Sequence, residues 1–155
     1  MEILSVVITL AIVALIVLWY SRKFKNAFLD TLEFLPGEKI LHEESVQKLE
    51  ANVRLKQIRT FPNSLVRITN KRLILAQNVP GSDKKSLRYV FNLNSSAEKI
   101  EPYLGYTTMS LTKKNLNVTK SEIEIIPTMG TGSQVPNWIK FTPTNFNACT
   151  KALGL

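Results

Sequence analysis

The chain of 155 residues carries 20 Lys and Arg against 12 Asp and Glu, a formal net charge of +8. Its single cysteine excludes an internal disulfide, and its length leaves room for one domain after the apolar N-terminal run, not for two. Residues 54–88 carry nine Lys and Arg against Asp83 alone. That segment therefore accounts for the whole excess of positive charge.

The first predicted element is a membrane anchor. Residues 3–20 contain no charged side chain, and a basic stretch follows them directly. A helix of this length reaches roughly 27 Å, close to the hydrocarbon thickness of a bilayer. We therefore predict an N-terminal transmembrane helix with its basic flank over residues 1–25. The side chains expected at the membrane interface are Trp19, Tyr20, Arg22, Lys23 and Lys25.

A cleavable secretory signal is the main alternative for this run. A signal would need basic residues before the apolar core and small residues at the cleavage site. Here Glu2 precedes the run, and Trp-Tyr-Ser-Arg-Lys ends it. The excess of Lys and Arg after the run predicts a single-pass protein with its N-terminus outside and its C-terminal domain in the cytoplasm. Cys149, the only thiol, agrees with a reducing compartment.

A helical linker is predicted next, over residues 26–37. Apolar residues recur at spacings of four, four and three along 24–35, which suits a helix that continues from the first one. Pro36 and Gly37 are expected to end it. The third predicted unit is a domain over residues 38–155.

This domain begins with a pattern typical of strands. Apolar and polar residues alternate over 49–55, so that one face meets a core and the other meets water. Residues 61–64 are predicted as a turn, because proline cannot donate to a strand ladder. Residues 65–69 and 72–77 predict a hairpin around Asn70 and Lys71, with the asparagine in the left-handed conformation of a tight turn.

The remaining elements are short. Alternation of Leu87, Tyr89, Phe91 and Leu93 predicts another strand, and further strands are expected around 106–112, 116–119, 122–126 and 137–142. Thr144 is the expected N-cap of a C-terminal helix. The apolar stripe of that helix comprises Phe146, Cys149, Ala152 and Leu153.

Three local patterns point to one family. The run from Leu35 to Leu41 resembles the "L-x-x-G-E-x-I-L" entry of bacterial pleckstrin-homology-like and GRAM-type domains. The run from Val66 to Leu75 is similar to their "T-N-x-R-L-I-L" hairpin, and Trp138 to Phe141 followed by a short helix is similar to their ending. The resemblance covers about residues 35–153. It implies a mainly β fold, in which a strongly bent antiparallel sheet of seven strands is capped by the C-terminal helix.

The residues show no convergent catalytic set. His42 is the only histidine, and a lone histidine beside two glutamates is usually a surface or packed residue. Glu43 and Glu44 point to opposite faces of a strand, so they cannot act as one carboxylate pair. Glu122 and Glu124 share a face that reads as solvated, and Cys149 reads as a buried thiol. No Cys and His spacing suits zinc. We therefore predict a protein that is not an enzyme, with no cofactor and no metal site.

The basic segment is the remaining signal. Six residues are candidates for contact with an anionic surface: Arg54, Lys56, Arg67, Lys84, Lys85 and Arg88. Each Lys or Arg near an anionic leaflet contributes about 1 kcal/mol, and tethering raises the effective concentration. The alternative is an ordinary solvated sheet face. Among family members that bind phosphoinositides, an arginine is expected where this chain has Thr69, which argues against specific inositide recognition.

The sequence therefore predicts a membrane-tethered, non-enzymatic interaction module. Its expected partners are a membrane protein, anionic lipid headgroups or further copies of the chain. A nucleic-acid-binding domain held at the membrane is the alternative, since the charge would permit it. Tyr89 and Phe91 are expected in the core, however, which leaves no aromatic platform for stacked bases.

Overall fold

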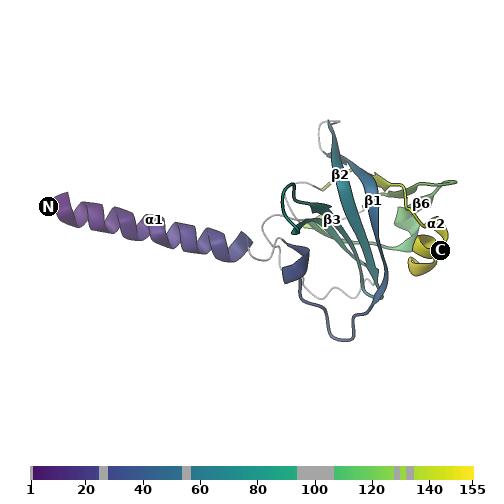
Figure 1. Ribbon diagram of the computed structural model, residues 1–155, viewed down its shortest axis with the longest axis horizontal. Coiled ribbons are helices and arrows are strands. Elements are labelled where there is room, and N and C mark those ends of the chain that lie inside the picture. Colours follow the sequence, from purple (N-terminus) through teal and green to yellow (C-terminus); the bar gives the residue numbers. More distant parts are fainter. Residues whose placement is uncertain (1, 25–27, 54–56, 94–106, 128–129, 132–134) are drawn as a thin grey trace.

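The computed structural model describes residues 2–24, 28–53, 57–93, 107–127, 130–131 and 135–155 (Figure 1). Nothing is described here of the residues between these ranges. The elements, in chain order, are α1 (Glu2–Phe24), η2 (Leu29–Thr31), β1 (Ile40–Val53), β2 (Gln57–Thr69), β3 (Arg72–Asn78), β4 (Lys85–Asn92), β5 (Thr107–Ser110), η3 (Lys113–Asn115), β6 (Leu116–Val118), β7 (Ile123–Ile125), β8 (Gly130–Thr131), β9 (Trp138–Phe141) and α2 (Phe146–Ala152).

One curled sheet makes up most of the described chain. Its nine strands follow the order β6-β7-β9-β1-β2-β3-β4-β5-β8, and every neighbouring pair is antiparallel except β4 and β5. The predicted pleckstrin-homology-like sheet of seven antiparallel strands is therefore wrong. A parallel pair needs a crossover of a dozen or more residues, and the separation between Asn92 and Thr107 provides it. Alternation in the sequence marks strands but does not reveal this pairing.

The predicted transmembrane helix is also wrong. None of the helices in the described ranges is long and apolar enough to cross a bilayer. The single-pass topology and the localisation inferred from the anchor are contradicted with it.

The longest strand, β1, organises the sheet. It pairs with β2 from Ile40 to Val53 and with β9 from Leu49 to Asn52. Its second half therefore lies inside the sheet, between a strand that follows it directly and one almost a hundred residues further along the chain. Figure 1 shows β1 and β2 crossing the domain as two long adjacent strands.

Both faces of the sheet carry apolar side chains. The inner core includes Leu49, Val66, Leu75 and Phe91, and α2 closes it with Cys149 and Leu153. A smaller outer cluster lies on the other face, where η2 covers it. Its buried members are Leu29, Leu65, Ile74, Ala76, Leu87 and Val90. Strands buried on both faces lose the polar half of the alternation, which explains the continuous apolar run in β3.

The predicted turn at 61–64 is wrong, because β2 continues through it. Pro62 lies opposite Lys48 of β1, and Asn63 adopts a positive φ of 49°. Pairing of β2 with β3 begins only at Ser64, so on that side Pro62 borders no strand. A proline is tolerated where its missing N–H would face no ladder.

Two helical predictions also change. Where a helical linker is predicted over residues 26–37, the described residues 28–37 contain only the single helical turn η2. The C-terminal helix forms as predicted, but Asn145 caps it instead of Thr144, accepting a hydrogen bond from Ala148 N at 3.1 Å. The Thr144 hydroxyl instead donates to Ser45 O of β1 at 2.9 Å, which fastens the start of α2 to the sheet.

Candidate functional site

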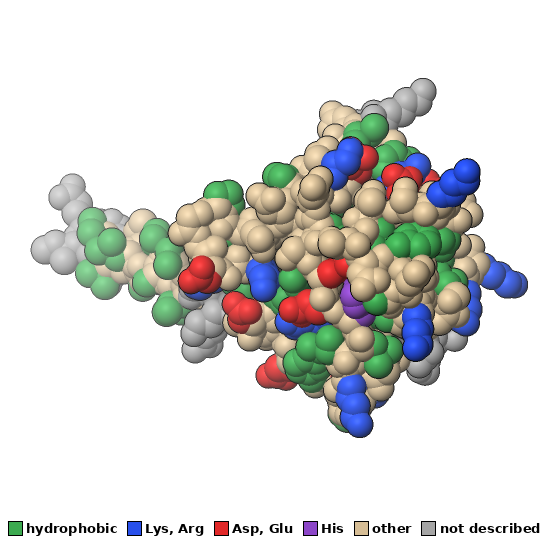
Figure 2. All heavy atoms as spheres, turned by 45° about the vertical axis from the view of Figure 1, so that its right-hand side comes forward, with side chains coloured by type: hydrophobic (Ala, Val, Ile, Leu, Met, Phe, Trp, Pro, Cys, Tyr) green, Lys and Arg blue, Asp and Glu red, His purple; other side chains and the backbone are tan. Residues whose placement is uncertain are grey.

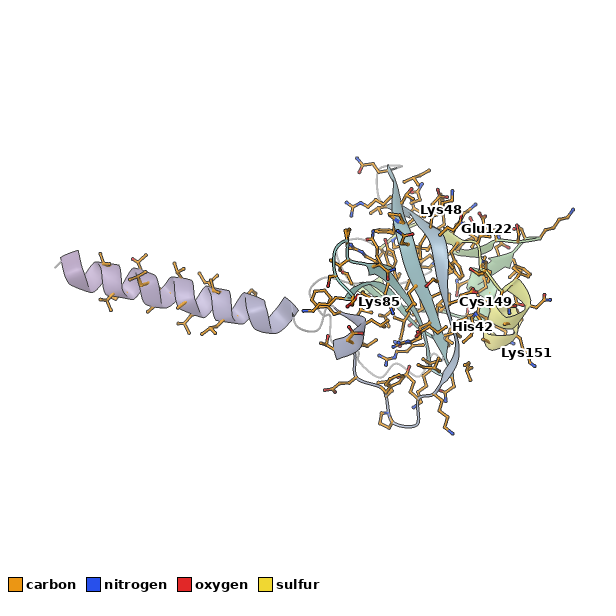
Figure 3. The ribbon with its side chains drawn as sticks, viewed as in Figure 1. His42, Lys48, Lys85, Glu122, Cys149 and Lys151 are labelled. Atoms are coloured by element: carbon orange, nitrogen blue, oxygen red, sulfur yellow. The ribbon has the colours of Figure 1, made fainter. Side chains whose placement is uncertain are left out.

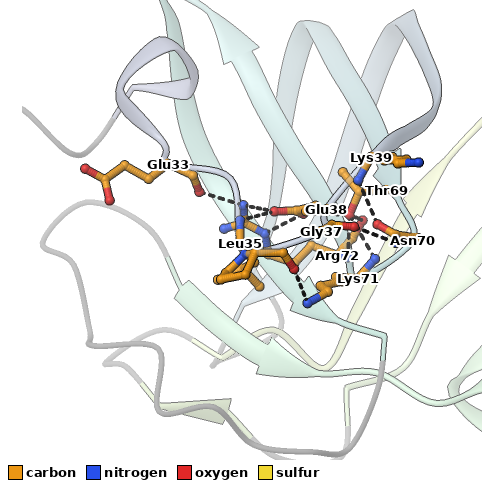
Figure 4. Close-up of polar contacts among 10 residues, drawn as sticks. Glu33, Leu35, Gly37, Glu38, Lys39, Thr69, Asn70, Lys71 and Arg72 are labelled. Carbon is orange, nitrogen blue, oxygen red and sulfur yellow. Dashed lines mark hydrogen bonds and ion pairs between the residues drawn. The ribbon is translucent and has the colours of Figure 1, made fainter.

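Two of the sequence motifs described above, the one around Glu38 and the one in the β2–β3 hairpin, contact each other in the folded chain. Glu38, in the segment before β1, contacts Thr69 and Arg72 at the end of the β2–β3 hairpin (Figure 4). The guanidinium Nε of Arg72 donates to Glu38 Oε1 at 2.8 Å, and its Nη2 donates to Oε2. The Thr69 hydroxyl donates to Glu38 Oε1 at 2.6 Å. We call Glu38, Thr69, Asn70 and Arg72 the clasp.

Asn70 joins the same two segments through its side chain. Its Oδ1 accepts a hydrogen bond from Lys39 N at 2.8 Å, and its Nδ2 donates to Gly37 O at 3.1 Å. The left-handed conformation predicted for Asn70 is not adopted, since Asn63 is the only non-glycine residue with a positive φ in the described ranges. The asparagine therefore acts by cross-linking segments, not by its backbone freedom.

The clasp contains a buried ion pair between Arg72 and Glu38. The side chains of Arg72 and Glu38 are 4% and 0% exposed. Burial alone raises the pKa of the Glu38 carboxyl, but the hydrogen bonds from Arg72, Thr69 and Leu35 N outweigh it, and the net pKa lies below the usual value. A carboxylate held charged in this way is satisfied locally, so the clasp is a structural fastening and offers no free group for chemistry.

The lowered pKa predicts an acid dependence of stability. A carboxyl with a depressed folded-state pKa stabilises the fold above its unfolded pKa of about 4.3, and the contribution is lost as the pH falls through the folded-state pKa. Urea unfolding of the wild type and Glu38→Gln, measured from neutral pH downward, is expected to show a smaller acid loss in the variant. Equal acid losses in both proteins would contradict this prediction.

The four basic candidates that the structure describes lie on different parts of the domain. Arg54 and Lys56 lie outside the described residues. Arg67 donates through Nε to the Glu43 carboxylate, and it lies opposite Ile74, on the outer face of the sheet. Arg88 donates to Gln77 Oε1 at 2.8 Å, and its guanidinium carbon lies 5.2 Å from the ring centroid of Phe61, which packs against the inner core.

A register shift separates these two arginines. Leu75 lies opposite Tyr89 and Ala76 opposite Leu87, so Arg88 has no residue opposite it in the β3–β4 ladder. Such a bulge reverses the face on which the following residues lie. Simple alternation along the sequence therefore cannot assign Arg88 to a face.

The two lysine candidates lie at the end of the domain that is nearest to α1. Lys84 Nζ is 5.4 Å from the ring centroid of Phe28, and Lys85, the first residue of β4, lies at the end of the domain nearest α1 (Figure 3). On the face drawn in Figure 2, Lys and Arg side chains are spread among acidic and uncharged ones. The described candidates therefore provide separate cations instead of one basic patch.

The predicted interface residues all belong to α1 or follow it. Trp19 is 52% exposed. Tyr20, Arg22 and Lys23 lie in the same helix, and their side chains are not described. Lys25 lies outside the described residues. Of the five predicted interface residues, only Trp19 has a described side chain.

A second cluster was missed by the sequence reasoning. His42 and Glu44 on β1 and Cys149 on α2 place one potential ligand atom each within 4.8 Å of one another. In the described chain this is the only group of three or more His, Cys, Asp or Glu side chains so placed. Figure 3 labels His42 and Cys149, and shows them on β1 and on the adjoining helix.

Burial distinguishes this cluster from a surface ion pair. The side chains of His42 and Glu44 are 15% and 8% exposed, and Cys149 is fully buried. His42 Nε2 and Glu44 Oε2 lie 3.5 Å apart, while Nε2 and the other carboxylate oxygen, Oε1, are buried without a hydrogen-bond partner. Burial, with the neighbouring Glu44 carboxylate, raises the pKa of the Cys149 thiol to about 12.

One signal in the sequence pointed toward the cluster. His42 and Glu44 are two residues apart in a strand, so they share a face, whereas Glu43 points away. Cys149 is more than a hundred residues further on, and no spacing rule connects it to them. Only the packing of α2 against β1 brings the thiol to that face.

The other chemical predictions can be placed as well. Glu122 and Glu124 lie 3.5 Å and 3.3 Å from Lys140 Nζ, while the neighbouring Ile123 and Ile125 are fully buried, as expected for a solvated face. Tyr89 and Phe91 are 5% and 0% exposed, which confirms that they belong to the core.

The family resemblance of the three motifs remains a prediction. Comparisons with family models, with curated proteins and with solved structures find no match for this chain.

Proposed function

We propose that the protein is a non-enzymatic interaction module whose α1 binds a partner presenting several apolar helices, as membrane proteins do. The observation that carries this proposal is the surface of α1. Every described side chain from Val6 to Trp19 is exposed, none of them is charged, and the large apolar ones are 51–66% exposed. Leaving such a surface in water is unfavourable by about 25 cal/mol for each Å² of apolar area.

The distribution of these side chains defines the kind of partner. Successive residues of a helix are about 100° apart, so an unbroken apolar run presents apolar atoms on every side. A helix of that kind is stable when it is buried all round, whereas one neighbouring helix covers a single stripe. The binding surface therefore has to come from several apolar helices together. Self-assembly of the chain and attachment to anionic lipid are the competing outcomes of the test.

The sheet domain supports a scaffold role. The carboxylates of Glu38, Glu43 and Glu124 are engaged in ion pairs, and the aromatic side chains of Tyr89 and Phe91 are in the core. The nucleic-acid alternative needs exposed aromatic rings for stacked bases, and the buried rings of Tyr89 and Phe91 do not supply them. In this function α1 binds the partner protein, and the sheet domain is the rigid support.

Photocrosslinking along α1 tests this function. Benzoylphenylalanine placed at Leu15 and at Val17 projects from nearly opposite sides of the helix, since two residues turn it by about 200°. Both positions are expected to give adducts with one and the same partner protein in cells. The same probe at Lys48, whose side chain is 61% exposed on β1, serves as the control and should give none.

A polar substitution sharpens the experiment. Leu15→Asp places a charge inside the proposed interface, where desolvation is costly, and should sharply lower the adduct yield from Val17. Circular dichroism checks that the sheet domain is unchanged. Adducts only between copies of the chain, adducts only with lipid, or equal yields from Lys48 would each reject the proposed partner.

A further inference from the structure

The cluster of His42, Glu44 and Cys149 has the composition of a metal centre. It offers an imidazole nitrogen, a carboxylate oxygen and a sulfur, all within 4.8 Å of one another. In a tetrahedral zinc site with bonds of about 2.0–2.3 Å, neighbouring ligand atoms lie roughly 3.3–3.7 Å apart. His42 Nε2 lies 3.5 Å from Glu44 Oε2, so the imidazole and the carboxylate are already close enough for one ion to bind both.

The orphaned polar atoms point to a ligand at the same place. A buried carboxylate oxygen without a partner costs free energy, and native proteins rarely leave one unpaired. Glu44 has such an oxygen in a side chain that is 8% exposed, and His42 Nε2 is orphaned beside it. These two atoms belong to two of the three residues of the cluster. A cation bound between them would satisfy both.

The surrounding contacts orient Glu44 and fasten the start of the helix that carries Cys149. Glu44 Oε2 accepts a hydrogen bond from Asn145 N at 2.8 Å, which orients the carboxylate and leaves Oε1 unpaired. Thr144 binds Ser45 O on the same strand, so α2 is fastened to β1 at two adjacent positions. Cys149 follows one turn later. Contacts of this kind to a ligating side chain are a regular feature of protein metal sites.

The cluster meets solvent at His42. Figure 2 shows the single histidine, in purple, at the surface, whereas Cys149 has no exposure. Three protein ligands with an open side leave a fourth position for water.

We propose that His42, Glu44 and Cys149 form a binding site for one zinc-like divalent transition-metal ion. Nitrogen and sulfur ligands select Zn²⁺ and Co²⁺ over Mg²⁺ and Ca²⁺, which prefer oxygen ligands. Binding forms a bond between the metal and the Cys149 sulfur and releases the thiol proton to solvent. His42 binds through the neutral Nε2, and the Glu44 carboxylate lowers the charge of the site.

Cobalt titration of the full chain tests the site. The protein is purified in a mild detergent without a polyhistidine tag, and Co²⁺ is added while the absorption spectrum is recorded. One equivalent should produce a thiolate-to-cobalt charge-transfer band, and Zn²⁺ should abolish it by displacement. Because the chain has one cysteine and one histidine, no other side chain of either type can replace these ligands.

Single substitutions locate the metal. Cys149→Ser should remove the charge-transfer band, and His42→Gln and Glu44→Gln should each weaken Zn²⁺ binding by at least about tenfold. Glu43→Gln is the matched control, since that carboxylate lies on the opposite face and pairs with Arg67, and its affinity should equal that of the wild type. Circular dichroism verifies that each variant is folded. His42→Gln keeps the test valid if replacement of the fully buried Cys149 prevents folding.

Thermal unfolding provides a second readout. Zn²⁺ that binds only the folded state should raise the midpoint for the wild type and for Glu43→Gln, but not for His42→Gln. The absence of a thiolate band at saturating Co²⁺ would overturn the proposal. Equal Zn²⁺ affinity in the wild type, His42→Gln and Glu44→Gln would also overturn it.

Discussion

Replacement of Arg72 by methionine is expected to lower the free energy of unfolding by about 3–5 kcal/mol, the cost of removing one partner from a buried ion pair. The Glu38 carboxylate, fully buried, would lose its main counter-charge and two donors. The guanidinium Nη2 also donates to Glu33 O at 2.8 Å, so the same change releases the segment before β1. Together these losses make the clasp one of the most sensitive positions in the domain.

Urea denaturation of the full chain, followed by circular dichroism at constant detergent concentration, measures this loss. The matched control is Arg67→Met, which removes the same side chain from the partly exposed pair with Glu43. Pairs of that kind contribute about 0–1 kcal/mol. Adding Glu38→Gln to Arg72→Met should recover part of the stability, because the uncompensated charge disappears. Equal losses in the two arginine variants would show that the clasp is not a strong fastening.

Replacement of Phe91 by alanine is expected to cost about 3–5 kcal/mol through lost burial and the cavity left behind. Phe91 is fully buried in the inner core. It lies opposite Leu73 of β3 on one side and Met109 of β5 on the other. The cavity would therefore open where the antiparallel part of the sheet meets its parallel pair, and neighbouring strands cannot close it without changing register.

The same denaturation experiment checks this prediction against Phe34→Ala. Phe34 is 52% exposed, and surface substitutions of that kind usually change stability by less than about 0.5 kcal/mol. Phe91→Ala should move the urea midpoint far below that of Phe34→Ala with a similar slope. A loss below about 1 kcal/mol would mean that the inner core tolerates rearrangement around this ring.

Local patterns predicted the elements whose residues contact near neighbours in the chain. The hairpin of β2 and β3, the strand from Lys85 to Asn92 and the helix from Phe146 to Ala152 all form where the alternation or the apolar stripe indicates. Their side-chain periodicity follows directly from backbone geometry, since a strand repeats every two residues and a helix every 3.6. The motifs around Glu38 and Arg72 were also visible, although only the folded chain shows that they contact each other.

Other predictions failed where distant contacts decide the outcome. The sequence predicts a turn at Pro62. The proline lies within strand β2 instead, because β2 has no second partner strand at that point. Arg88 reads as outward-facing, but a bulge against β3 turns it toward Phe61. The number of strands and the parallel pairing of β4 with β5 likewise depend on which strand edges meet, and single-strand periodicity does not encode that choice.

The candidate metal site shows the same difference between what the sequence predicts and what the packing of the folded chain decides. Composition and charge placed the excess of positive charge between residues 54 and 88, and the alternation put His42 and Glu44 on one face. Tertiary structure then decided which residues act together: Arg67 pairs with Glu43, Arg72 with Glu38, and Cys149 reaches His42 from α2. The physical reason is that periodicity sets the direction of a side chain, whereas its partner is set by packing between elements that lie from 24 to more than a hundred residues apart in the chain.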